Sequence, residues 1–318
     1  MTADAFFKIA WDPCFGLALP PGYRFPMAKY PQLYARLQAA DWLPGTAFFT
    51  PGWPDRRLLL QAHDEVYLHA LETLSLDRQQ ERRVGFPLSE ALIRREYRLA
   101  QATWECAQWA LQHRRWAFSC AGGTHHAFRD RGEGFCLLND IAVAAYGLLQ
   151  AGLERILVID LDVHQGNGTA AIFAAEPRVF TFSMHGARNF PLRKERSDCD
   201  IALPNGCGDA DYLSALDQAL NSIFEDFAPQ FVFYQAGVDV LASDKLGHLG
   251  LSLAGCKARD RRVFERLKAW GLPMVTVMGG GYSPDLELIV AAHYQTFEAA
   301  CAVWQTSAIL SEKQGLHG

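Results

Sequence analysis

The sequence lacks the features that mark several common classes of protein. It contains no run of about 18 apolar residues, so neither a membrane-spanning helix nor a membrane partner is expected. Its start, MTADAFFKIAWDPC, lacks the basic segment and long apolar segment of an export signal, so a cytoplasmic location is expected. An excess of positive charge is also missing, because the formal net charge is -5. Direct binding to nucleic acid is therefore not expected.

Paired cysteine motifs and repeated segments are missing as well. The eight cysteines are scattered with no CxxC pair, which favours reduced, mostly buried thiols over disulfides or a thiolate metal site. No internal repeat, low-complexity tract or linker divides the chain. We therefore expect residues 1–318 to form a single domain.

Apolar runs that alternate with helical patterns are present throughout the chain. The hydrophobic fraction of 50% is enough for a substantial core. Runs rich in β-branched or aromatic residues lie at 6–11, 116–123, 155–163, 178–185, 231–239 and 273–281. Apolar residues at helical spacing lie between most of them, at 89–113, 137–151, 209–227, 254–270 and 285–304. This alternation predicts an α/β fold, with a central, mainly parallel sheet flanked by helices on both faces.

Five of the apolar runs end in side chains capable of chemistry. These are His125 and His126, then Asp160, Asp162 and His164, then Ser183 and His185, then Asp239, and finally Tyr282. Because parallel strands present their carboxyl ends on one edge of a sheet, we expect these residues to meet there.

The stretch VIDLDVH predicts a metal site. On a strand, Asp160, Asp162 and His164 would point to the same side. With Asp239 as a third ligand, two carboxylates and an imidazole suit zinc or iron(II) and leave a position for water or substrate. Asp239 alone can equally be a cap or turn residue. Beside the triplet the metal interpretation is favoured, because buried charges gathered in one place need a compensating cation.

Two glycine-led motifs accompany the metal residues. In GGTHH, one of the adjacent His125 and His126 can act on water while the other supports it; the alternative is a structural role. In GGGY, the phenol of Tyr282 can donate a hydrogen bond to a developing oxyanion. Glycine-rich loops are common, but no established phosphate-binding pattern is present here.

The motifs AGGTHHAFRDRGEGFCLLND (121–140), VIDLDVHQGNGT (158–169), QAGVD (235–239) and MGGGY (278–282) occur in that order. Together they resemble the zinc-dependent histone deacetylase superfamily. HQGNG and RFPMAKY (24–30) make the chain most similar to class IV and to bacterial deacetylase-like proteins. The resemblance implies the arginase/deacetylase fold over essentially the whole chain.

The resemblance also implies residue roles. Asp162, His164 and Asp239 match the zinc ligands, with iron(II) as the alternative metal. His126 matches the general base that acts on water and later protonates the leaving amine, and His125 matches its electrostatic partner.

Further catalytic and cation-binding positions follow from the same resemblance. Tyr282 matches the phenol that polarises the acyl carbonyl, and Asp160 matches the partner of His125. Asn167 stands where most members carry Asp, so His126 is expected to be less basic than it would be beside a carboxylate. A structural potassium ion is implied, with ligands from Asp160, Ser183 and the backbone of Asp162, His164 and Met184.

The substrate channel is implied less securely. Its walls match Gly134, Phe135, Phe190 and Gly280. The segment MHGARNFPLRKERSD (184–198) lacks the Pro-Gly pattern of larger family members, so the rim and acyl-length preference are left open.

The expected activity is hydrolysis of an acetyl or longer acyl group from a lysine side chain in a peptide or protein. One alternative substrate is an acetylpolyamine or another small acylated amine, which would call for an acid at the rim; the sequence does not place Glu133, Glu195 or Asp198 there. The motifs also leave open an inactive acyl-lysine binding module and an arginase-like enzyme with two manganese ions, both of which they fit less well. The oligomeric state is left open.

An arginine-rich stretch, LDRQQERRVGFPLSEALIRREYR (76–98), also has two interpretations. It is typical of the solvated face of a helix and its lead-in, and the functional alternative is an interface or the rim of a pocket.

Overall fold

One parallel β-sheet organises the chain. The computed structural model describes residues 6–23 and 25–315. Within them, eight strands lie in the order β2-β1-β3-β8-β7-β4-β5-β6, and every neighbouring pair is parallel. The strands are β1 (Phe7–Ala10), β2 (Phe48–Phe49), β3 (Trp116–Ser119), β4 (Ile156–Asp160), β5 (Val179–Gly186), β6 (Cys199–Leu203), β7 (Phe231–Gln235) and β8 (Met274–Val277).

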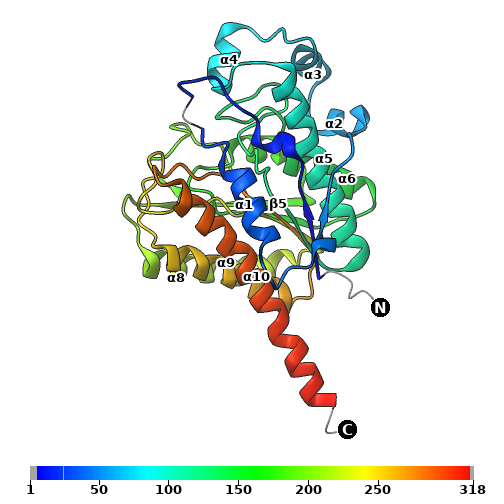
Figure 1. Ribbon diagram of the computed structural model, residues 1–318, viewed down its shortest axis with the longest axis vertical. Coiled ribbons are helices and arrows are strands. Elements are labelled where there is room, and N and C mark those ends of the chain that lie inside the picture. Colours follow the sequence, from blue (N-terminus) through cyan, green and yellow to red (C-terminus); the bar gives the residue numbers. More distant parts are fainter. Residues whose placement is uncertain (1–5, 24, 316–318) are drawn as a thin grey trace.

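Helices connect the strands and cover both faces of the sheet. The α-helices are α1 (Lys29–Gln38), α2 (Arg56–Ala62), α3 (Glu65–Glu72), α4 (Arg78–Val84), α5 (Glu90–His113), α6 (Asp140–Gln150), α7 (Asn167–Phe173), α8 (Asp209–Phe227), α9 (Leu253–Ala269) and α10 (Leu286–Gly315). Short 3-10 helices lie at η1 (Pro13–Gly16) and η2 (Gly45–Ala47). Figure 1 shows α8, α9 and α10 grouped away from α5 and α6, as expected for helices on opposite faces of one sheet.

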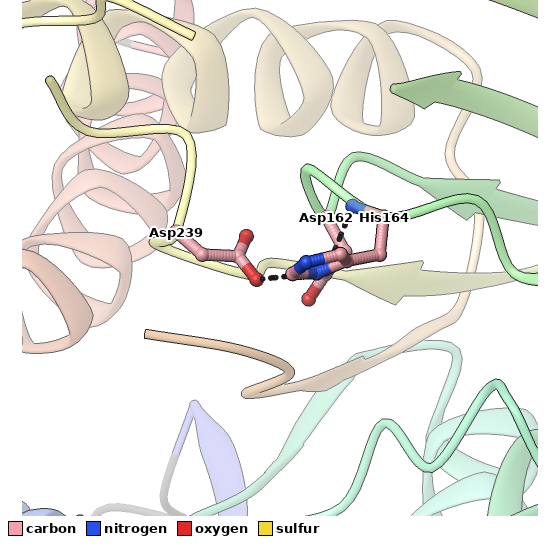
Figure 2. Close-up of side chains that lie close together, drawn as sticks. All are labelled: Asp162, His164 and Asp239. Carbon is pink, nitrogen blue, oxygen red and sulfur yellow. Dashed lines mark hydrogen bonds and ion pairs between the residues drawn. The ribbon is translucent and has the colours of Figure 1, made fainter. Parts of the chain in front are cut away.

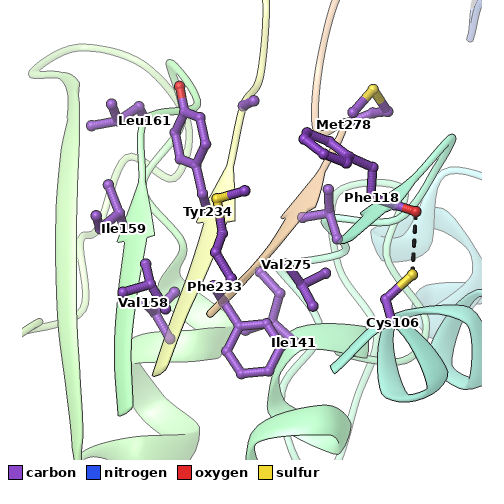
Figure 3. Close-up of a cluster of buried hydrophobic side chains, with 14 of the residues drawn as sticks. Cys106, Phe118, Ile141, Val158, Ile159, Leu161, Phe233, Tyr234, Val275 and Met278 are labelled. Carbon is purple, nitrogen blue, oxygen red and sulfur yellow. Dashed lines mark hydrogen bonds between the residues drawn. The ribbon is translucent and has the colours of Figure 1, made fainter. Parts of the chain in front are cut away.

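Side chains from successive strand residues pack into two apolar layers. On one face, Phe118 and Tyr234 contact Phe264 of α9. On the other, Phe233 lies beside Ile141 of α6 (Figure 3). Every residue of β4 is buried, as expected for a strand between β5 and β7 with helices on both sides. The carboxyl ends of the central strands are therefore held on a rigid frame.

The predicted α/β architecture is confirmed, with two strands and several helices added. Each of the six apolar runs overlaps a strand, and each of the five predicted helical stretches overlaps a helix. The missed strands are β2, which has two residues, and β6, whose positions alternate between half-buried and exposed before the buried Leu203. The missed helices α1, α2, α3, α4 and α7 have at most ten residues each, too few for a clear helical period.

The cysteines form no disulfide bond, since all eight are free. No helix within residues 6–23 and 25–315 is both long and apolar enough to cross a membrane.

Candidate active site

Three potential metal ligands meet just beyond the carboxyl ends of β4 and β7. Asp162 and His164 lie in the loop after β4, and Asp239 lies in the loop after β7 (Figure 2). Their candidate ligand atoms all lie within 4.8 Å of one another. Nδ1 of His164 is 3.0 Å from Oδ1 of Asp162 and 3.1 Å from Oδ2 of Asp239. The expected convergence is therefore present.

The reason for this convergence differs from the sequence argument. β4 ends at Asp160, so Asp162 and His164 are not strand residues and the same-side argument from strand periodicity was wrong. The loop instead bends through local hydrogen bonds. The backbone N–H of Asp162 donates to Oδ1 of Asp160 (3.1 Å), and that of His164 donates to Oδ1 of Asp162 (3.0 Å). The other carboxylate oxygen of Asp160 lies beside His125 and not beside the three potential ligands.

The electrostatics of the three-ligand cluster fit a divalent cation. All three residues are buried. Burial and the nearby Asp162 raise the pKa of Asp239 to about 7. Although burial disfavours an imidazolium, the hydrogen bonds that Asp162 and Asp239 accept from the ring raise the pKa of His164 to about 10. Two buried carboxylates thus require a nearby positive charge, and the N/O ligand set is one that zinc accepts.

Asp160 supports the first histidine of the tandem pair. Oδ2 of Asp160 lies 2.6 Å from Nδ1 of His125, and both side chains are buried. Burial opposes protonation of His125, but Asp160 and Asp162 more than offset this and raise its pKa. His125 is therefore suited to carry positive charge beside the metal-ligand cluster.

The second histidine has a different environment. Nδ1 of His126 lies 2.6 Å from Oδ1 of Asn167, so the imidazole donates its Nδ1–H and keeps Nε2 as an acceptor. Burial, followed by the charges of His125 and His164, lowers the pKa of His126 well below its ordinary value. The two adjacent rings, 4.1 Å apart between centroids, thus have opposite protonation tendencies.

The GGGY loop brings the phenol to the cluster. The N–H of Gly280 donates to Oδ2 of Asp162 (2.7 Å), and the N–H of Tyr282 donates to Oδ2 of Asp244 (2.6 Å). A Cβ at position 280 would lie 1.9 Å from Oδ2 of Asp239, so only glycine allows this close approach. Burial and then the negative charge of Asp162 and Asp239 raise the pKa of Tyr282 well above its ordinary value. The phenol therefore stays protonated and can donate a hydrogen bond.

A cavity of about 490 Å³ leads from the surface to these groups, and we call it the entrance cavity. Its lining includes His126, His164, Tyr282, Gly134, Phe135 and Phe190. His126 and His164 are buried, whereas Phe190 is 38% exposed, so the cavity runs inward from Phe190 to the metal-ligand cluster. Gly280 lies on a smaller and deeper cavity that also contacts Asp162.

The residues of the implied potassium site lie beside the cluster. Asp160 and Ser183 are register partners on β4 and β5, and Met184 follows on β5. Oγ of Ser183 lies 3.0 Å from Nδ1 of His185. The backbone and side-chain oxygens of this corner are thus buried next to the zinc-type ligands.

The three acids considered for the rim are separated by the structure. Glu133 lines the entrance cavity. Asp198 instead accepts hydrogen bonds from the backbone and side chain of Thr181 on β5. Glu195 contacts Gln165 through its backbone and does not line the entrance cavity as the described residues form it.

Several supporting residues were missed by sequence reasoning. Arg259 of α9 is fully buried and donates to the carbonyls of Leu161 (3.1 Å) and Gly237 (2.6 Å), just ahead of two ligands. Asp140 accepts hydrogen bonds from the backbone of the GGTHH loop. The motif RFPMAKY offered a clue to a third residue, because its Lys29 is buried and donates to the carbonyl of Gly279 (3.1 Å). The first residue of that motif, Arg24, lies outside the described residues.

Comparisons with known proteins agree with this geometry. The Histone deacetylase domain family matches residues 23–297. An uncharacterized protein of Picosynechococcus sp. is 40% identical over 299 residues, covering 94% of this chain and 99% of that protein. Histone deacetylase 2 of Arabidopsis thaliana is 35% identical over 182 residues, covering 56% of this chain and 47% of that protein. Histone deacetylase 1 of Homo sapiens is 32% identical over 198 residues, covering 59% of this chain and 39% of that protein.

These matches span less than half the length of the two named histone deacetylases. The fold is also shared with solved structures. An HDAC homolog from Aquifex aeolicus has a TM-score of 0.79 at 24% identity, covering 92% of this chain and 84% of that one. An HDAC homolog complexed with SAHA gives the same TM-score. Since the family match covers residues 23–297, most of the chain, this chain belongs to the histone deacetylase domain family, and its fold is that of its structural relatives.

Proposed function

We propose that this protein hydrolyses N-acyl groups from lysine side chains with the help of a zinc ion. Membership of the family supports a deacetylase-type hydrolase. One observation carries the finer proposal. His164 of the metal-ligand cluster, the neutral His126 and the protonated Tyr282 all line the same cavity, which is large enough to admit a linear side chain.

Asp162, His164 and Asp239 would hold the metal. Bound there, zinc supplies a Lewis acid for the acyl carbonyl and lowers the pKa of water. Asp160 keeps His125 oriented and charged beside this centre. A second, monovalent cation is proposed for the corner formed by Asp160, Ser183 and the backbone of Asp162, His164 and Met184, supported by the burial of these oxygens.

His126 and Tyr282 would carry out the remaining steps. Nε2 of the neutral His126 takes the proton of the attacking water, because Nδ1 is already committed to Asn167. The phenol O–H of Tyr282 donates to the carbonyl oxygen as negative charge develops on it. His126 then returns its proton to the departing amine nitrogen, which leaves as a neutral lysine side chain. We assign the whole process to one catalytic domain, supported by the single sheet.

The substrate panel that tests this function compares acetyl-, butyryl-, octanoyl- and myristoyl-lysine peptides with acetylputrescine and acetylspermidine. We expect turnover of the peptides that is lost on chelation and restored by zinc; restoration by iron(II) alone would change the assigned metal. Turnover of the polyamines only would move the protein to the small-amide alternative. No turnover by the zinc-loaded protein would leave a binding module.

Two variants test the residue roles. His126→Ala and Tyr282→Phe are expected to lower kcat by about 10²-fold or more while zinc content is unchanged. The matched controls are His69→Ala and Tyr23→Phe, because both side chains are exposed and lie outside the lining of the entrance cavity. Full activity in either test variant would remove that residue from the mechanism.

A further inference from the structure

Two arginines stand at the outer end of the entrance cavity. Arg82 and Arg83 line it together with His126 and Tyr282, although α4 lies far from both in the sequence. Both arginine side chains are exposed. The arginine-rich stretch that sequence analysis left open between a solvated helix face and a rim therefore supplies part of the rim.

The position of these arginines is fixed by the wall of the channel. α4 ends at Val84 and is closed by Gly85 in a left-handed conformation (φ 83°). The N–H of Gly134 donates to the carbonyl of Arg83 (3.0 Å), and the N–H of Phe135 donates to the carbonyl of Val84 (2.7 Å). The end of α4 is thus hydrogen-bonded to Gly134 and Phe135, which holds the backbone of Arg83 against the lining of the entrance cavity.

Their charge is little compensated. Some exposed arginines are paired, for example Arg57 with Asp55 and Arg261 with Glu265. Arg82 has no ion-pair partner among the residues that the structure describes. Arg83 interacts electrostatically with the half-buried Glu133, and Arg131 shares that acid.

The segment that carries the cavity residue Phe190 is also basic, although its arginines are not among the residues that line the cavity. The segment that carries Phe190 reads GARNFPLR (186–193) and holds Arg188 and Arg193 with no acidic residue between them. Both arginines are exposed. Among the residues that line the cavity, Arg82 and Arg83 stand with a single acid, Glu133, so the lining carries an excess of positive charge although the net charge of the chain is -5.

We propose that Arg82 and Arg83 form a carboxylate-recognising subsite that selects acylated amines carrying an acidic group next to the acyl-lysine. Guanidinium groups bind carboxylates in a bidentate manner, whereas like charges at an interface disfavour binding. Acidic residues flanking the modified lysine in a peptide supply this chemistry, and the free carboxylate of N-ε-acetyl-lysine is its other source. Acylpolyamines carry the opposite charge and are rejected. This inference rests on the proposed function.

The experiment uses peptides of equal length in which acetyl-lysine is flanked by Glu, Gln or Lys, together with N-ε-acetyl-lysine and acetylputrescine. We expect kcat/KM to fall about tenfold from Glu to Gln flanks, mainly through KM, because flank binding is the same in the ground and transition states. The preference should weaken with added salt. The peptides can retain the preference for Glu while N-ε-acetyl-lysine is turned over only weakly. That result would identify acidic side chains of the peptide as the carboxylates that the subsite binds.

Variants connect the preference to the arginines. In R82Q/R83Q the Glu and Gln flanks should become equal, and in R82E/R83E the order should reverse in favour of Lys. Arg78→Gln is the matched control, since this exposed arginine begins the same helix but does not line the cavity. Equal use of the three flanks by the unaltered protein, or an unchanged order in R82E/R83E, would overturn the inference.

Fluorescence anisotropy of the same labelled peptides separates this inference from the proposed function. Turnover of the neutral Gln-flanked peptide tests the deacylase activity alone. Tighter binding of the Glu-flanked peptide by the zinc-loaded protein, lost in R82Q/R83Q, supports the subsite even if no peptide is hydrolysed. Identical binding of Glu and Lys flanks would contradict the subsite even if all peptides are hydrolysed.

Discussion

Nδ1 of His126 donates to Oδ1 of Asn167 across 2.6 Å, and this contact fixes which nitrogen of the ring is available for chemistry. A carboxylate in place of the amide would favour an imidazolium. Asn167 offers only a neutral acceptor, so burial and the charges of His125 and His164 dominate and keep the pKa of His126 well below its ordinary value. The ring is therefore neutral, with a free Nε2, at neutral pH.

Replacing Asn167 by Asp should shift the pH dependence of catalysis. The new carboxylate would raise the pKa of His126, because an adjacent negative charge favours the imidazolium. Because only the neutral base accepts a proton, the acid limb of kcat/KM should move to higher pH. The pH–rate profile checks this, with Asn205→Asp on an exposed loop as the control. An acid limb that stays in place would show that His126 is not the titrating base.

Removal of a proposed metal ligand should separate metal content from folding. In Asp239→Asn the N/O ligand set loses a charge, and we expect bound zinc to fall well below one equivalent and kcat/KM to drop by about 10²-fold or more. Metal analysis of the purified protein and circular dichroism provide the readouts. Asp226→Asn, at an exposed position of α8, should keep both metal and activity. A full equivalent of zinc in Asp239→Asn would exclude this residue as a ligand.

Arg259 should contribute strongly to stability. It pairs with Asp260 (2.8 Å) with both side chains fully buried, and it also holds the carbonyls of Leu161 and Gly237. Arg259→Met leaves Asp260 as a buried charge without its partner and should lower the free energy of unfolding by about 3–5 kcal/mol. Denaturant titration measures the change.

The same helix provides the control for this prediction. Arg261→Met removes an exposed pair with Glu265 and should cost less than about 1 kcal/mol. Zinc affinity should also fall in Arg259→Met, because the loops that carry Asp162 and Asp239 lose their common anchor. Equal stability losses in the two variants would contradict the role assigned to Arg259.

His63 should make the fold sensitive to acid. Its buried ring donates from Nδ1 to the carbonyl of Phe128 (3.0 Å) and accepts at Nε2 from the N–H of Asn139 (2.9 Å). Burial, opposed only in part by the carbonyl hydrogen bond, lowers the pKa of His63 from 6.5 to about 4. The lowered pKa means that the stabilisation is complete above pH 6.5 and is lost as the pH falls from 6.5 to about 4.

The pKa difference gives the size of the loss in unfolding free energy, which is roughly 3 kcal/mol over that pH range. His63→Gln should flatten the dependence of unfolding free energy on pH, whereas His69→Gln, at an exposed position, should leave it unchanged. The measurement is denaturant unfolding of each variant near neutral pH and near pH 4. Parallel pH curves for the unaltered protein and His63→Gln would contradict the assignment.

Local sequence was enough to predict the layered α/β fold. Each run such as ILVI needs burial on both faces, and the intervening helical patterns supply the cover, so a parallel sheet with its carboxyl ends aligned follows. The same reasoning predicted that His126, Asp162 and Tyr282 lie at one edge of the sheet. It missed β6 and α4, because half-exposed edge strands and two-turn helices leave weak periodic patterns.

The sequence by itself determined which chemical groups gather at the carboxyl edge, because the alternation of apolar strands and amphipathic helices makes the strands parallel and aligns their carboxyl ends. Tertiary structure alone decided which partner each of those groups contacts. β4 stops at Asp160, so the loop turns Asp160 toward His125 and Asp162 toward Asp239. Tertiary structure also decided that Arg83 borders the entrance cavity, because its carbonyl accepts a hydrogen bond from Gly134, about 50 residues further along the chain. Loop direction and long-range contacts depend on packing across the whole sheet, and no local period encodes them.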